Sequence, residues 1–143
     1  MPINDSLDLS HGSVLHIKGF STRGHPPRNK FCVILGRENP SGEVLAFLIS
    51  SQPQYAKQSA YCNEIVTIPK GAVHYLPQES FIQCFVLERL DPEKLADEFD
   101  SGAIDQKGKL PTKYLYRIKA SAEKAKLLTQ QEIDSVIHVL ALP

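Results

Sequence analysis

The order of strand and helix signals along this chain predicts an α+β fold in which the helices follow the strands. Up to residue 90, short apolar runs rich in β-branched residues are separated by polar loops, as is typical of strands. From Asp91 onward, helix-capping residues precede apolar residues at helical spacing. Because the two kinds of signal are grouped rather than interleaved, the sequence favours α+β over an alternating α/β arrangement.

The composition is that of one globular domain. A chain of 143 residues with 42% apolar and 22% charged residues can bury a real core. No apolar run reaches the ~20 residues that span a bilayer, and the first five residues do not resemble a signal peptide. The three cysteines lack C-x-x-C spacing, which suits a reducing compartment, and Cys32 and Cys84 are expected in the core. We therefore expect a single cytoplasmic domain over residues 1–143, without membrane contact, whose residues 1–12 form a loose arm.

Five strands are expected, at residues 13–18, 30–36, 43–49, 64–68 and 81–87. The second and third carry apolar residues at successive positions and flank a turn-forming stretch at residues 38–42. They predict an antiparallel hairpin that is buried on both faces. A small, strongly curved barrel would bury both faces, so the expected architecture is an SH3-like β-barrel of about five to seven strands with C-terminal helices packed on it.

Three helices are expected after the strands. Asp91 can cap a helix with Pro92 at its first position, and this helix should end near Gly102. Residues 103–111 are expected to form a connection, after which Thr112 can cap a second helix. Thr129 and Glu132 form a capping-box pattern that opens the third helix.

The charges sum to zero, which argues against a large and uniformly basic nucleic-acid surface, but they are unevenly distributed. Residues 88–100 hold six acidic residues against two basic ones, and residues 101–126 hold seven basic residues against two acidic ones. Either cluster is equally well explained as ordinary solvated surface.

The hairpin predicts a meeting of cations and hydroxyl groups at its open end. Arg28 and Lys30 precede its first strand, and Ser50, Ser51 and Gln52 follow its second. The loop before it, residues 19–29, adds Arg23 and His25, and the loop after it, residues 51–63, adds Tyr55. No histidine or cysteine has metal-ligand spacing, and no P-loop, dinucleotide fingerprint or G-x-S-x-G motif is present.

Such a cluster suits a phosphodiester. Arginine binds phosphate oxygens through a bidentate fork and lysine acts as a point charge, while a serine hydroxyl can hold a non-bridging oxygen in place. With RNA, the 2′-hydroxyl is itself the nucleophile, so positioning, a proton acceptor and cations suffice. Tyrosines in the adjoining loop could stack on unpaired bases, although surface or rim packing is the simpler explanation for each of them.

Three stretches of this chain resemble the MazF/PemK-like toxins of bacterial toxin–antitoxin pairs. They are residues 29–35, residues 48–52, and residues 78–95, in which a Ser-led strand runs into the start of a helix. The final helix, residues 130–141, is similar to the closing helix of that family, and residues 100–126 resemble an insertion. The resemblance implies an SH3-like barrel with appended helices, a homodimer, and a metal-independent endoribonuclease that needs no cofactor.

The resemblance also implies roles for individual residues. Ser50 takes the hydroxyl role, and Arg28 or Lys30 takes the cationic role, because Asn29 stands in register with the arginine of the family. Arg23, His25, Ser51, Gln52 and Tyr55 would contact RNA, with His25 or Arg28 moving protons. The implied products are a 2′,3′-cyclic phosphate and a 5′-hydroxyl end, and the implied partner is a cognate acidic antitoxin. Two alternatives remain open, a non-catalytic module that binds RNA or a peptide, and a purely structural dimerising domain.

Overall fold

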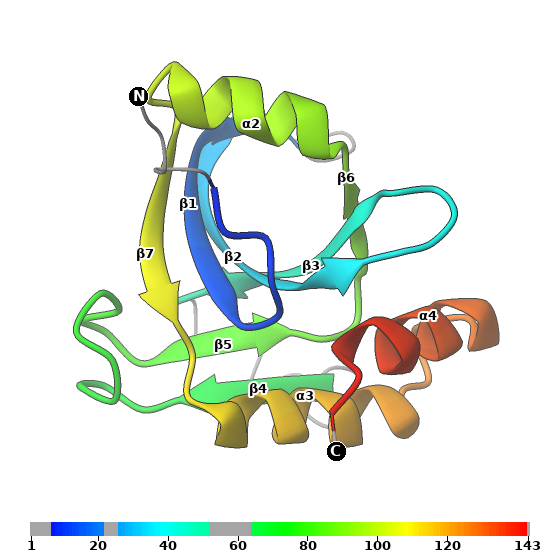
Figure 1. Ribbon diagram of the computed structural model, residues 1–143. Helices are drawn as coiled ribbons and strands as arrows, with labels where there is room; N and C mark the ends of the chain where they lie inside the picture. Colours follow the sequence, from blue (N-terminus) through cyan, green and yellow to red (C-terminus); the bar gives the residue numbers. More distant parts are fainter. Residues whose placement is uncertain (1–6, 22–25, 52–63, 143) are drawn as a thin grey trace.

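The computed structural model describes residues 7–21, 26–51 and 64–142, which form one antiparallel sheet and three helices (Figure 1). The strands are β1 Ser13–Phe20, β2 Arg28–Arg37, β3 Val44–Ser50, β4 Ile65–Ile68, β5 Ser80–Gln83, β6 Glu88–Leu90 and β7 Ile104–Lys109. The helices are α2 Pro92–Asp100, α3 Thr112–Glu123 and α4 Gln130–Leu140. The predicted α+β class and the C-terminal helices are therefore confirmed. Among the described residues, no helix is both long enough and apolar enough to cross a bilayer.

The sheet is open, which corrects the prediction of a barrel. Its strands follow the order β4-β5-β3-β2-β1-β7, and β6 pairs with a second part of β3. The strands at the two edges are β4 and β7, and no ladder between them occurs in the described part of the chain. The number of strands is within the expected range. Closure is unnecessary because helices cover both faces: α2 lies on one side of the sheet and α3 and α4 lie on the other (Figure 1).

The central hairpin is buried on both faces, as predicted. Val33 and Phe47 belong to the cluster that packs under α3 and α4, whereas Ile34 and Ala46 belong to the cluster that packs against α2. All four side chains are 0% exposed. Successive residues of a strand point to opposite faces, so an unbroken apolar run supplies both cores at once. Each large side chain buried in this way stabilises the fold by about 1.5–3 kcal/mol.

The two cysteines predicted in the core are buried there. Cys32 belongs to the α2-side cluster and Cys84 to the cluster under α3 and α4. Burial of the thiol raises the pKa of each to about 12. Both side chains therefore act as small apolar residues.

Two strand predictions were wrong. The expected strand 81–87 stops at Gln83, and β6 begins only at Glu88. The chain turns here because Cys84 enters the core and its backbone N–H bonds to the carbonyl oxygen of Glu64, 2.9 Å away. The expected connection 103–111 contains β7, which pairs with β1. Its sequence, I-D-Q-K-G-K, has no apolar alternation because it is an edge strand in which only Ile104 is buried.

The helix caps were predicted with one error. The Asp91 side chain accepts from the N–H of Glu93 at 2.9 Å, and the Thr129–Glu132 capping box is complete. Thr112 is the first residue of α3 rather than its cap; Pro111 occupies the cap position and makes no side-chain cap bond. The side-chain caps explain why the starts of α2 and α4 were predicted to the residue, whereas the start of α3 was misplaced by one residue.

The segment that resembles an insertion, residues 100–126, contributes to the core. It contains β7 and α3, and α3 buries an apolar face made of Tyr114, Leu115, Ile118 and Ala122. Whether it is an insertion relative to other proteins stays a prediction. At the other end of the chain, Leu7 and Leu9 pack against the α2-side cluster, and the N–H of Asp8 donates to Gln106 Oε1 at 2.8 Å.

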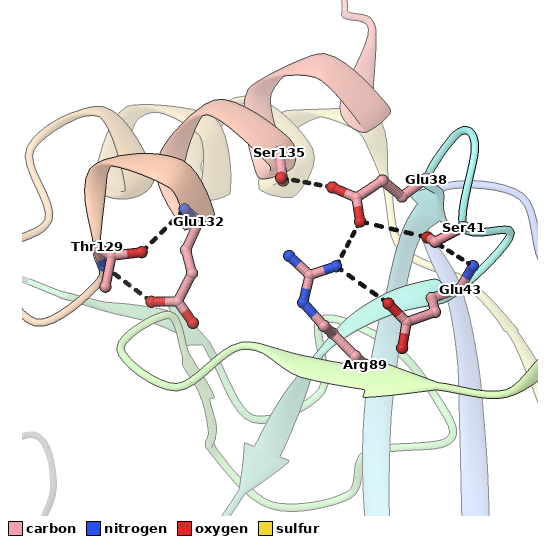
Figure 2. Close-up of polar contacts among 7 residues, drawn as sticks. All are labelled: Glu38, Ser41, Glu43, Arg89, Thr129, Glu132 and Ser135. Atoms are coloured by element: carbon pink, nitrogen blue, oxygen red, sulfur yellow. Dashed lines mark hydrogen bonds and ion pairs between the residues drawn. The ribbon is translucent and has the colours of Figure 1, made fainter.

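A cluster of charged and polar side chains lies beside the turn that joins β2 to β3 (Figure 2). We call Glu38, Glu43, Arg89 and Ser135 the turn-end cluster; the Arg89 guanidinium contacts both carboxylates, and the Ser135 hydroxyl donates to Glu38 at 2.5 Å. The Ser135 hydrogen bond and the Arg89 contact hold the pKa of Glu38 below its ordinary value. The cluster thereby joins the hairpin to β6 and to α4.

Candidate functional site

A depression of about 330 Å³ lies at the open end of the same hairpin. Its lining comes from three segments: residues 28–31 at the start of β2, residues 49–51 at the end of β3, and residues 76–78 and 80 before and at the start of β5. We call it the open-end depression. Predicted site residues from both strands, Arg28, Lys30, Ser50 and Ser51, lie together in its lining.

The register of the hairpin explains why these residues meet. Phe31 pairs with Ile49 in the antiparallel ladder, so residues that precede Phe31 lie beside residues that follow Ile49. One step beyond that pair, Lys30 comes opposite Ser50, and Arg28 shares the face of Lys30 because side chains alternate along a strand. The three residues predicted as catalytic are thus placed on one face at one sheet end.

The cations of the depression are uncompensated within the part of the chain that the structure describes. The ion pairs found there join Arg89 to Glu38 and Glu43, and Lys109 to Asp8, and none involves Arg28 or Lys30. Arg28 is exposed and Lys30 is half-buried. The depression therefore has a positive local potential on a chain with zero net charge.

The segment before β5 forms one wall, which sequence reasoning did not predict. Leu76 is buried, and its N–H bonds to the carbonyl oxygen of Val73 at 3.3 Å. The buried Ser80 hydroxyl donates to the carbonyl oxygen of Gln78 at 2.9 Å. Ser80 therefore shapes the wall. Nothing in the local sequence indicates this role, because it depends on how β5 pairs with β3.

Asn29, the residue in register with the arginine of the resembled family, has a structural contact. Its side-chain oxygen accepts the N–H of Gly19 at 3.1 Å, which joins the start of β2 to the end of β1. An amide carries no positive charge, so Asn29 cannot replace an arginine. Among the described residues of the lining, the positive charges come from Arg28 and Lys30.

His16 is a titratable side chain near the depression that sequence reasoning missed. It pairs with Phe31 across the β1–β2 ladder, and the centroids of the two rings are 4.6 Å apart. Burial lowers the pKa of His16 and the charge of Lys107 lowers it further, while Asp105 partly opposes the shift. A neutral imidazole is able to accept a proton, but strand alternation places His16 with Phe31 on the face opposite to Lys30 and Ser50. Only the pairing of β1 with β2 could have identified it.

The other predicted contacts cannot be placed. Arg23, His25, Gln52 and Tyr55 lie outside the described residues, so their roles stay predictions. Within the described ranges, no group of three or more histidine, cysteine, aspartate or glutamate residues is arranged to hold a metal ion.

Comparison of the sequence with protein-family models found no matching family, and comparison with curated proteins found no significant match.

Proposed function

We propose that the open-end depression binds the phosphate backbone of single-stranded RNA and cleaves it without a metal ion, as the toxin of a toxin–antitoxin pair would. The observation that supports this most is the convergence of Arg28, Lys30 and Ser50 on one depression, with no described acid paired to either cation. Uncompensated cations beside a hydroxyl group fit a phosphodiester better than they fit a neutral ligand.

The proposed reaction is an internal transfer. The 2′-oxygen attacks the adjacent phosphorus, a new O2′–P bond forms, and the P–O5′ bond breaks. Arg28 and Lys30 stabilise the charge on the phosphorane, and the Ser50 hydroxyl positions a non-bridging oxygen so that attack is in line. A histidine takes the 2′-hydroxyl proton, and water protonates the leaving 5′-oxygen. His25 is the candidate for that histidine, because strand alternation places His16 on the face of Phe31, opposite to Lys30 and Ser50. The products are a 2′,3′-cyclic phosphate and a 5′-hydroxyl end.

The proposed partners follow from the same charges. An acidic antitoxin segment would occupy the depression by pairing with Arg28 and Lys30, and would thereby exclude RNA. A cytoplasmic homodimer is part of the proposal through the resemblance to MazF/PemK-like toxins.

A second candidate function is a non-catalytic module that binds RNA or a peptide in the same depression. The contact that favours it is the hydrogen bond of Asn29 to Gly19, because this residue ties two strands together where the resembled family has an arginine. Binding would then survive without cleavage.

The test is incubation of the purified protein with a mixed-sequence, 5′-labelled single-stranded RNA in EDTA, followed by gel analysis. Ser50→Ala is expected to lower the cleavage rate by about 10²-fold, the typical loss when one oxyanion-stabilising hydrogen bond is removed. Arg28→Ala should have an effect of similar size. Arg37→Ala is the matched control, since Arg37 is exposed at the opposite end of β2.

Two outcomes would contradict the endoribonuclease. If Ser50→Ala and Arg28→Ala cleave at the wild-type rate, the assigned residues are wrong. If wild type binds RNA and yields no product after long incubation, the non-catalytic module is the better description.

A further inference from the structure

The exposed face of α3 carries a row of cations that the proposed site does not use. Lys113, Arg117 and Lys124, the last at the C-cap, are all exposed. At 100° per residue they lie within about 40° of one another around the helix axis. Tyr116, 41% exposed, lies at the edge of this row, about 60° from Lys113 and about 100° from Arg117 around the helix axis. We call these four residues the α3 basic face.

The charges of this face are uncompensated and locally unfavourable. In the described parts of the chain, no acidic side chain forms an ion pair with Lys113, Arg117 or Lys124. Lys113 and Arg117 are four residues apart, where like charges on a helix repel one another. Lys113 also lies in the first turn of α3, which has no acidic residue, so it opposes the helix dipole. A chain selected only for stability would favour an acidic residue there.

The positions of two of these cations are fixed by an aromatic ring. The charged groups of Lys113 and Arg117 each lie 5.3 Å from the ring centroid of Tyr114, which is 1% exposed. In these cation–π contacts the charged groups themselves lie over the ring, while Lys113 and Arg117 as whole residues stay exposed. Such cations lose less conformational entropy on binding than freely rotating ones.

The strand that precedes α3, β7, lies close to one wall of the open-end depression. Lys107 of β7 is exposed, and its charge helps to lower the pKa of His16, which contacts Phe31 in the lining. The ring of Tyr75 packs over Gly108, about 3.5 Å from where a Cβ would stand, and the following Leu76 belongs to the wall of the depression. The strand that carries Lys107 then leads directly into α3.

We propose that the α3 basic face is a second contact surface for single-stranded RNA, which binds the phosphate backbone of the same strand outside the depression. The identity of the polyanion rests on the proposed function. Charges four residues apart on a helix are separated by about 6 Å along its axis, a spacing that lets neighbouring cations contact different phosphates. Tyr116 adds an exposed aromatic ring on which a base can stack.

The competing occupant is a second copy of this chain. The α2 helix has exposed acidic residues, Glu93, Asp97 and Asp100 among them, and lies on the opposite side of the sheet from α3 (Figure 1). A head-to-tail contact between α2 and α3 would pair opposite charges. Exposed ion pairs between two short helices stabilise little, so the RNA backbone is the better partner.

The experiment measures binding of a 5′-labelled oligouridylate by fluorescence anisotropy between 50 and 300 mM salt. All proteins carry Ser50→Ala so that cleavage does not interfere. Arg117→Glu and Lys124→Glu together should weaken binding about ten-fold or more at low salt, and lower the slope of log affinity against log salt by about 1.4, or ~0.7 per phosphate contact. Lys124→Glu alone should show half that slope change, and it leaves both contacts to Tyr114 intact.

Lys94→Glu is the matched control, because Lys94 is an exposed cation on α2 and the change in charge is the same as in either single variant. The proposal is overturned if the double variant binds within two-fold of this control with an unchanged slope. It is also overturned if sedimentation without RNA shows self-association at low salt that Arg117→Glu abolishes while RNA affinity is unaltered.

The two proposals fail separately. A protein that binds RNA through α3 and never cleaves it overturns the endoribonuclease and supports the α3 contact. A protein that cleaves RNA, and whose affinity for RNA does not change when Arg117 and Lys124 are substituted, supports the endoribonuclease and overturns the α3 contact.

Discussion

The two ends of the β2–β3 hairpin carry similar types of residue, but their basic side chains have acidic partners at one end only. At the turn end, Arg89 contacts Glu38 and Glu43, and Glu38 also accepts from Ser135. At the open end, Arg28 and Lys30 have no acidic partner among the described residues. The same two strands therefore support paired charges at one end and uncompensated charges at the other.

This difference separates stability from recognition. Paired charges at the turn end satisfy one another and connect β6 and α4 to the hairpin, so their removal should loosen the fold. The cations at the open end have no ion pair to lose, so we expect their removal to leave stability nearly unchanged and to weaken the proposed binding of RNA. Substitutions at the two ends test this separation.

The largest effect on stability is expected from Gly36→Ala near the turn end. Gly36 has φ +148°, and an added Cβ would lie 2.8 Å from the carbonyl oxygen of Val139 in α4. Backbone strain and displacement of α4 together should cost about 2–4 kcal/mol in the free energy of unfolding. The measurement is urea denaturation followed by circular dichroism.

Gly42→Ala is the control for this prediction. Gly42 also has a positive φ, +76°, but its nearest neighbour is an Arg37 side-chain nitrogen at 3.7 Å. Only backbone strain remains there, which costs about 1–2 kcal/mol. Equal losses in the two variants would show that α4 does not pack tightly against Gly36.

A smaller effect is expected from Arg89→Ala. The change removes both ion pairs of the turn-end cluster, leaves the Ser135–Glu38 hydrogen bond, and should destabilise the protein by about 1–2 kcal/mol, since the cluster is only partly exposed to solvent. A double-mutant cycle with Glu38→Gln measures the coupling directly. Lys109→Ala is the comparison: it removes the more exposed Lys109–Asp8 pair and the hydrogen bond from Lys109 to the Ser10 hydroxyl, which together should contribute less than about 1 kcal/mol. Absence of coupling between Arg89 and Glu38 would remove the turn end as a stabilising element.

The Arg89–Glu38 pair should also make the stability of the protein depend on pH. The pKa of Glu38 is below its ordinary value of 4.5 in the folded protein. Its contribution to stability is therefore fully present above pH ~4.5 and is lost as pH falls through the folded pKa. The difference in free energy of unfolding between wild type and Glu38→Gln should therefore shrink as the pH is lowered below ~4.5. A difference that stays constant from pH 6 to pH 3 would contradict the assignment.

The smallest effect on stability is expected at the open end. Arg28→Ala combined with Lys30→Ala should change the free energy of unfolding by less than about 0.5 kcal/mol, because neither side chain has an ion pair to lose. Affinity for single-stranded RNA should fall at the same time, which anisotropy measures. A loss of more than 1 kcal/mol would mean that these cations are structural, and would end the contrast between the two ends.

Much of the fold was readable because local patterns are strong. The unbroken apolar runs around residues 31–35 and 44–49 predicted a hairpin buried on both faces, and the Thr129–Glu132 capping box predicted the start of α4. The β7 strand was not readable, because an exposed edge strand needs no apolar pattern. The break after Gln83 was not readable either, because it depends on Cys84 entering the core.

The candidate site divides in the same way. Placing Arg28 and Lys30 beside Ser50 required only an antiparallel hairpin, and the sequence was sufficient for that. His16 and the wall around Leu76 required the pairing of β1 with β2 and of β5 with β3, which are contacts between distant segments.

The sequence by itself determined the α+β class, the buried hairpin and the meeting of cations with hydroxyl groups at its open end. All three follow from side-chain periodicity and local turn chemistry. Only the tertiary structure decided that the sheet stays open, because helices on both faces bury what barrel closure would otherwise have to bury. It also decided which charges are paired, since Arg89 reaches Glu38 across 51 residues of chain.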